Sequence, residues 1–132
     1  SPDYKIVKFV NSVVPKNGKI LLSEGLHHRF YLNAKNEVYH HKYFWGNFNR
    51  KVPFDSGKEF LRSLRSKGFT HIATHDRPGL NWSHWGIASE LMGRLEKCCV
   101  RFLSSEEFTK LVGSKRFGNN EKIVVSIYEL RE

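Results

Sequence analysis

Segments with helical periodicity alternate with apolar segments of strand length along this chain. Residues 2–14 repeat apolar side chains every three or four positions and stop at Pro15, which predicts a helix. Residues 19–25 form a continuous apolar run closed by a glycine, as in a strand that is buried on both faces. Strands that alternate with helices of this length build a mainly parallel sheet with helices on both faces. The sequence therefore predicts an α/β fold, a three-layer Rossmann-like sandwich.

The rest of the chain continues this alternation of helices and strands. We expect a short turn (27–32), a weak strand (38–41), a helix that ends at Lys67-Gly68 (56–67), a strand (69–75), a helix (83–97), a strand (100–103) and a last strand (123–130). Ile20–Leu22 and Ile72–Thr74 are expected to be central parallel neighbours. Segment 104–120 fits either a helix cap or the first arm of a hairpin with the last strand. Such a hairpin gives the sheet an antiparallel edge at the C-terminus.

Length and composition indicate one folded domain over residues 1–132. Hydrophobic residues make up 39% of the chain and charged residues 27%, which excludes a disordered chain. No apolar run approaches the ~18 residues of a membrane span, so these residues are expected to be soluble by themselves. The first residue is Ser1 and the single methionine is Met92, so we expect a domain cut from a longer protein.

Charged side chains cluster where the predicted parallel strands end. In open α/β sheets, ligands bind beyond the carboxyl ends of the strands. The candidates there are Glu24 and Arg29 after the first strand, and His75, Asp76 and Arg77 after the third. A carboxylate, an imidazole and a guanidinium can bind an anion or transfer a proton. The competing interpretation is that polar residues simply populate such loops.

The sequence predicts neither a cofactor nor a metal. It lacks the glycine patterns GxGxxG and GxxxxGK[ST] of nucleotide sites, and it lacks the GxSxG nucleophile elbow. His40 and His41 are adjacent, so on a strand they point to opposite faces. His71 and His75 would share a strand face at roughly 13 Å, too far apart for one ion. No nucleophile, base and orienting group occur together, so no catalytic residue is assigned.

A basic segment rich in aromatic residues is the second candidate site. Lys42, Arg50 and Lys51 flank Tyr43 and Trp45 in a chain whose net charge is +9. Interleaved rings and cations are typical of single-strand nucleic-acid binders, and they are equally suited to anionic lipid head groups. Basic residues elsewhere spread over every predicted helix, which argues against nucleic acid. We therefore expect a membrane or another anionic partner at this segment.

Five segments carry a resemblance to a known family: Pro15, the strand at 19–24, Arg-Phe-Tyr-Leu at 29–32, Gly-Phe-Thr-His-Ile at 68–72 and Ser-Ile-Tyr-Glu-Leu at 126–130. Their order and spacing resemble the soluble C-terminal domain that follows the transmembrane helices of some bacterial polyprenyl-phosphate-sugar-dependent glycosyltransferases. These are the membrane-embedded GT-C enzymes similar to protein mannosyltransferases and to the lipid A aminoarabinose transferase. The resemblance spans nearly the whole chain.

The resemblance implies a non-catalytic domain on the extracytoplasmic, periplasmic face of the cell membrane. In such enzymes the chemistry belongs to acidic residues of the membrane part, so the domain would assist acceptor or lipid-carrier binding. Its implied partners are the transmembrane part of the same polypeptide and an anionic lipid or polyprenyl-phosphate sugar. His75-Asp76-Arg77 and the basic aromatic segment depart from the family pattern. Two alternatives remain: a basic nucleic-acid-binding module, and a small α/β enzyme or sensor domain that uses the strand-end residues.

Overall fold

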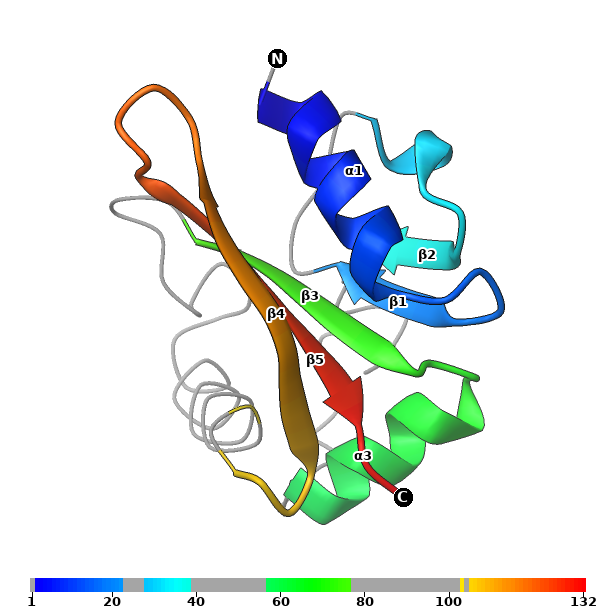
Figure 1. Ribbon diagram of the computed structural model, residues 1–132. Coiled ribbons are helices and arrows are strands. Elements are labelled where there is room, and N and C mark those ends of the chain that lie inside the picture. The colour runs from blue at the N-terminus through cyan, green and yellow to red at the C-terminus, as the bar shows by residue number, and fades with distance from the viewer. Residues whose placement is uncertain (1, 23–27, 39–56, 77–102, 104) are drawn as a thin grey trace, which may run out of the picture.

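The computed structural model describes residues 2–22, 28–38, 57–76, 103 and 105–132 (Figure 1). The elements are α1 (Pro2–Val13), β1 (Lys19–Leu22), the 3₁₀ turn η1 (Arg29–Tyr31), β2 (Lys35–Val38), α3 (Gly57–Ser66), β3 (His71–Asp76), β4 (Thr109–Phe117) and β5 (Ile123–Leu130). The predicted helix 83–97 lies outside the described residues.

The five strands form one mixed sheet in the order β2-β1-β3-β5-β4. β1 pairs in parallel with β2 and with β3, whereas β5 runs antiparallel to both β3 and β4. The prediction that Ile20–Leu22 and Ile72–Thr74 are central parallel neighbours is confirmed, since Leu21 lies opposite Ile72. The expected mainly parallel sheet needs correction to a mixed sheet, because two of the four pairings, β3 with β5 and β4 with β5, are antiparallel. The antiparallel edge itself is confirmed.

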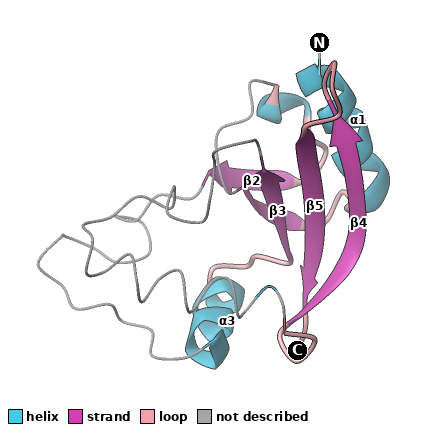
Figure 2. Ribbon diagram, turned by 90° about the vertical axis from the view of Figure 1, so that its left-hand side faces the viewer, coloured by secondary structure: helices cyan, strands magenta, loops and turns pink. Residues whose placement is uncertain are grey.

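Helix α1 covers one face of the sheet (Figures 1 and 2). Its apolar residues recur at helical spacing and are almost fully buried against alternate residues of the strands: Ile6, Val7, Val10 and Val14 against Ile20, Leu22, Ala73, Val125 and Ile127. The helix crosses β4 at Gly113, where an added Cβ would lie 3.1 Å from Val13 and 3.2 Å from Phe9. Close approach of the helix to the hairpin therefore depends on a glycine at this position.

Helix α3 lies on the opposite side of the sheet from α1 (Figure 2). Its predicted apolar stripe is confirmed, since Phe60, Leu61 and Leu64 are buried. The helix ends at Gly68 as predicted: with φ at +83°, Gly68 donates to Arg65 O at 2.9 Å, and Phe69 donates to Leu64 O at 3.1 Å. This pair of bonds is the Schellman arrangement, which favours glycine.

Residues 109–130 form a hairpin, so the second of the two structures predicted for segment 104–120 is the one observed. β4 spans nine residues and its register with β5 shifts between Leu111 and Gly113, a bulge that accommodates one extra residue. Of the predicted strand 100–103 the structure describes only Leu103, which is helical. Within the described parts of the chain, no helix has the length and apolar character that a membrane crossing requires.

Candidate functional site: the groove beside His71 and Glu129

An open groove of about 1,090 Å³ lies at the amino ends of β1 and β3. Its walls come from the C-terminal end of α1 with the turn that follows, from Arg65 of α3, from the Glu106–Glu107 turn and from the residues that end β5. Because β5 is antiparallel to β3, its carboxyl end meets the amino ends of the parallel strands here. We call this cavity the β3–β5 groove.

Thr70 joins the three chain segments that form the floor of the groove. Its hydroxyl accepts a hydrogen bond from Lys19 N at 2.9 Å, while its backbone N–H donates to Lys19 O at 2.9 Å. Its carbonyl accepts from Leu130 N at 2.9 Å. Gly18 is buried beside it, and an added Cβ there would lie 3.0 Å from Thr70 Oγ1 and from Val14. The turn after α1 therefore needs this glycine to approach β3.

His71 is the most buried titratable group of the groove, with 6% of its surface exposed. Its Nδ1 lies 2.7 Å from Thr70 Oγ1. Burial lowers the pKa of His71 from 6.5, while the nearby Glu129 carboxylate raises it and offsets part of that shift. Glu129 is the direct cross-strand partner of His71, so both side chains stand on the same face of the sheet. His71 is therefore largely neutral at pH 7 and can exchange a hydrogen bond with a polar ligand.

Carboxylates outnumber cations along the groove. Four of the chain's 13 acidic residues line it, Glu106, Glu107, Glu129 and Glu132, against two of its 22 basic residues, Arg65 and Arg131. The groove thus carries negative charge although the chain as a whole carries +9. Such a site attracts neutral hydroxyl-bearing or cationic groups and repels phosphate.

The two arginines are engaged by the protein itself. Arg65 donates to the carbonyls of Leu130 at 3.3 Å and Arg131 at 3.2 Å, and it pairs with Glu132 at 3.3 Å. Arg131 donates from Nε to Thr109 O at 3.3 Å. Within the described residues, no three metal-ligating side chains gather at one point. The groove carboxylates are spread along its walls, which suits an extended ligand better than a single ion.

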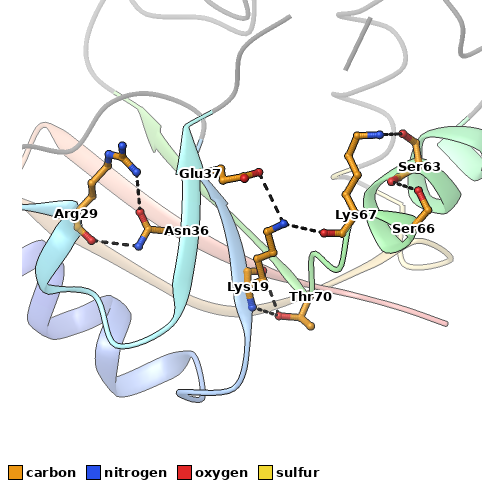
Figure 3. A network of polar contacts seen from close by, with 8 residues as sticks. All are labelled: Lys19, Arg29, Asn36, Glu37, Ser63, Ser66, Lys67 and Thr70. Atoms are coloured by element: carbon orange, nitrogen blue, oxygen red, sulfur yellow. Dashed lines mark hydrogen bonds and ion pairs between the residues drawn. The ribbon is translucent and has the colours of Figure 1, made fainter. Parts of the chain in front are cut away.

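Arg29 is the one predicted strand-end residue whose side chain the structure describes (Figure 3). Its Nη1 donates to Asn36 Oδ1 at 3.2 Å, and Asn36 Nδ2 donates back to Arg29 O at 3.1 Å. Its guanidinium also lies 4.5 Å from the centre of the Phe30 ring. These contacts hold Arg29 against the start of β2, away from the β3–β5 groove.

The other predicted site residues are described in part or not at all. The backbone of His75 and Asp76 belongs to β3 and pairs with Val125 and Val124, so the strand includes Asp76. The side chains of these two residues, and the residues Glu24, Arg77, Lys42, Tyr43, Trp45, Arg50 and Lys51, lie outside the description. The site expected at the carboxyl ends of the parallel strands stays a prediction, whereas the groove lies at their amino ends.

Lys19 anchors β1 to the turn after α3 (Figure 3). Its Nζ donates to Lys67 O at 2.7 Å, lies 4.3 Å from the centre of the Phe69 ring and faces Glu37 Oε2 at 3.8 Å. Glu37 Oε2 is buried and has no hydrogen-bond partner within the described residues. Lys19 therefore fixes the turn after α3 to β1, which is a structural role.

Sequence reasoning did not assign the groove residues His71, Glu129, Arg65, Glu106 and Glu107. One signal was available: Glu129 follows the buried residues Val125 and Ile127 at alternate positions, so it lies on the same sheet face as these two and is exposed at the end of the strand. The comparisons with known proteins add no relative, because no family model, no curated protein and no solved structure matches this chain.

Proposed function

We propose that this chain is a non-catalytic extracytoplasmic domain of a membrane-embedded glycosyltransferase that uses a polyprenyl-phosphate sugar. Its role is to assist acceptor binding, and the β3–β5 groove is the site that holds the acceptor. We also propose that the whole fold is a Rossmann-like three-layer sandwich, to which the predicted helix 83–97 contributes.

One observation carries the proposal: segments that share the family resemblance meet at one groove. Pro15, Thr70 and His71 of the 68–72 segment, and Glu129 and Leu130 of the 126–130 segment all line it. These positions are far apart in the chain and are joined through Thr70. A resemblance confined to core residues would reflect packing alone, whereas these residues border a cavity that a ligand can enter.

The charge of the groove favours the acceptor over the lipid carrier as its ligand. A polyprenyl phosphate is anionic and would meet the carboxylates of Glu106, Glu107 and Glu129. A sugar or peptide hydroxyl, or an amine, can instead bond to Glu129 and to neutral His71. Because the catalytic acids of such enzymes belong to the membrane part, the groove would lower the KM for the acceptor and leave the chemical step unchanged.

The family assignment is tested by the coding sequence that precedes Ser1. We expect several apolar spans of about 20 residues, each long enough to cross a bilayer as a helix. A soluble domain directly upstream would contradict the assignment.

The groove is tested by Glu129→Gln in the full-length enzyme. Loss of a hydrogen bond to a charged group should raise the KM for the acceptor about tenfold, with kcat and the KM for the lipid-linked donor unchanged. Glu121→Gln on the β4–β5 turn is the matched control and should leave all three constants unchanged. A variant with normal acceptor KM, or with reduced kcat and normal KM, would rule out an acceptor role for the groove.

A further inference from the structure

Two large aromatic side chains stand out of the η1 turn. Phe30 is 82% exposed and Tyr31 is 73% exposed, and Tyr4 on α1 is 58% exposed. Single exposed apolar residues are ordinary on protein surfaces. The two adjacent exposed rings of Phe30 and Tyr31 form a patch, and such patches mark interaction sites.

The patch rests on a fixed base. Asn11 of α1 donates from Nδ2 to Tyr31 O at 3.2 Å and accepts from Asn33 N at 2.8 Å, which ties η1 to the helix. Leu32, the next residue, is buried in the core. The rings of Phe30 and Tyr31 therefore point outward because their backbone is held in place.

Cations accompany the rings. Arg29 lies over the Phe30 ring, and Lys8 lies 5.7 Å from the centre of the Tyr4 ring. Tyr4, Lys8 and Asn11 follow the spacing of one helix face, so this stripe leads directly to η1.

The β4–β5 turn adds further positive charge at the same end of the molecule. Figure 1 shows the start of α1 between η1 on one side and this turn on the other, all in the upper part of the view. Phe117 packs on Phe9 at 5.8 Å and joins the hairpin to the helix. This end carries six basic residues, Lys5, Lys8, Arg29, Lys115, Arg116 and Lys122, against the acidic residues Asp3, Glu121 and Asp76, the last of which ends β3 opposite Val124. We call it the η1–α1 end.

We propose that the η1–α1 end docks on the surface of an anionic lipid bilayer. This inference rests on the proposed function, since only a domain that lies beside a membrane would use such a contact. Aromatic rings settle at the level of the head groups, and lysines and arginines near the surface are attracted by anionic lipids. The exposed aromatic residues Tyr4, Phe30 and Tyr31 are absent from the walls of the β3–β5 groove, so the bilayer contact does not use the groove.

Charge and shape favour a bilayer over a nucleic acid. Single-strand binders hold bases on rings inside a positively charged groove. The β3–β5 groove is negatively charged and has no Phe, Tyr or Trp in its walls. The exposed rings project instead from a helix and a 3₁₀ turn.

Co-sedimentation of the 132-residue chain with vesicles tests the proposal. We expect binding to vesicles that contain phosphatidylglycerol, weak binding to pure phosphatidylcholine, and loss of binding as salt rises. Phe30→Ser with Tyr31→Ser should lower the partition coefficient at least about tenfold, and Lys8→Gln should lower it about fivefold. The matched controls are Leu111→Ser, at an apolar residue that is 55% exposed on β4, and Lys58→Gln on α3; both should bind like the parent chain.

Three results would overturn the proposal: equal binding to neutral and anionic vesicles, equal loss in the patch variants and their controls, or ring-dependent binding of a single-stranded oligonucleotide that exceeds vesicle binding. Circular dichroism of each variant separates loss of binding from loss of folding. The acceptor KM of Glu129→Gln is measured independently, so a failed bilayer contact and a failed acceptor role are distinguishable.

Discussion

The polar residues at the start of β3 show how side chains one position apart take different roles. Thr70 is bonded to Lys19 through both its backbone and its hydroxyl, and it closes the sheet. His71 reaches the groove, where its ring touches Thr70 through Nδ1 and faces Glu129. Thr70 fixes the geometry of the site, and His71 supplies a titratable imidazole.

His71 makes the stability of the chain depend on pH in a predictable direction. Burial lowers its pKa below 6.5, so the unfolded chain binds more protons at this residue than the folded chain does. Its effect on stability is therefore absent above about pH 7.5 and grows as the pH falls through 6.5. We expect His71→Gln to lose less stability than the parent chain between pH 8 and pH 5, as measured by urea unfolding at each pH.

The control for this prediction is Ser114→Ala, which removes no titratable group from an exposed position of β4. The change of its stability with pH should equal that of the parent chain. Identical curves for His71→Gln and the parent would show that His71 is protonated with equal ease in the folded and unfolded states.

At the level of elements, the contact between α1 and β4 depends on the absence of a side chain at Gly113. A valine there would force its Cβ against Val13 and Phe9, which already lie 3.1 and 3.2 Å from that position. Gly113→Val should therefore destabilise the chain by about 1–3 kcal/mol, the usual cost of overpacking a core. Thermal or urea unfolding measures the change.

Ser114→Val is the matched control for this prediction, since Ser114 is the next residue of β4 and is exposed. Its stability should stay within about 0.5 kcal/mol of the parent chain. An unchanged stability of Gly113→Val would mean that α1 can move away from the hairpin without cost.

The elements that sequence reasoning located are those whose ends are set by local chemistry. Pro15 cannot continue a helix, and Gly68 takes the positive φ that closes α3, so both ends were predictable. The sequence did not decide between a helix cap and a hairpin strand for β4, because Thr109–Phe117 mixes Lys, Gly, Ser and Arg with few apolar residues. That strand exists because β5 offers it a pairing edge, and no local pattern reports a partner.

The groove was harder to predict for the same reason. His71 and Glu129 become neighbours only through the register of β3 with β5, which joins distant parts of the chain. The parallel strands predict a ligand site at their carboxyl ends, whereas the antiparallel β5 brings carboxylates to their amino ends. A mixed sheet therefore carries polar residues at both of its ends.

At the level of the whole molecule, one of the two edges of the described sheet is protected against further pairing. β4 is the strand at this edge, and Lys110, Lys115 and Arg116 are exposed along it, with a bulge between Leu111 and Gly113. Charges and bulges on an edge strand discourage the addition of another strand. This architecture favours contacts through the ends of the sheet over association along its edge.

Charge is unevenly distributed over the described part of the chain. Carboxylates line the β3–β5 groove, whereas Lys8 and Arg29 lie beside the exposed rings of Tyr4 and Phe30. A surface of negative potential repels the first region and attracts the second, so it turns the rings toward itself before any contact is made. At physiological ionic strength the field decays over about 8 Å, so this rotation belongs to the last steps of approach. A chain that meets an anionic bilayer as proposed thus arrives with the rings of Phe30 and Tyr31 leading.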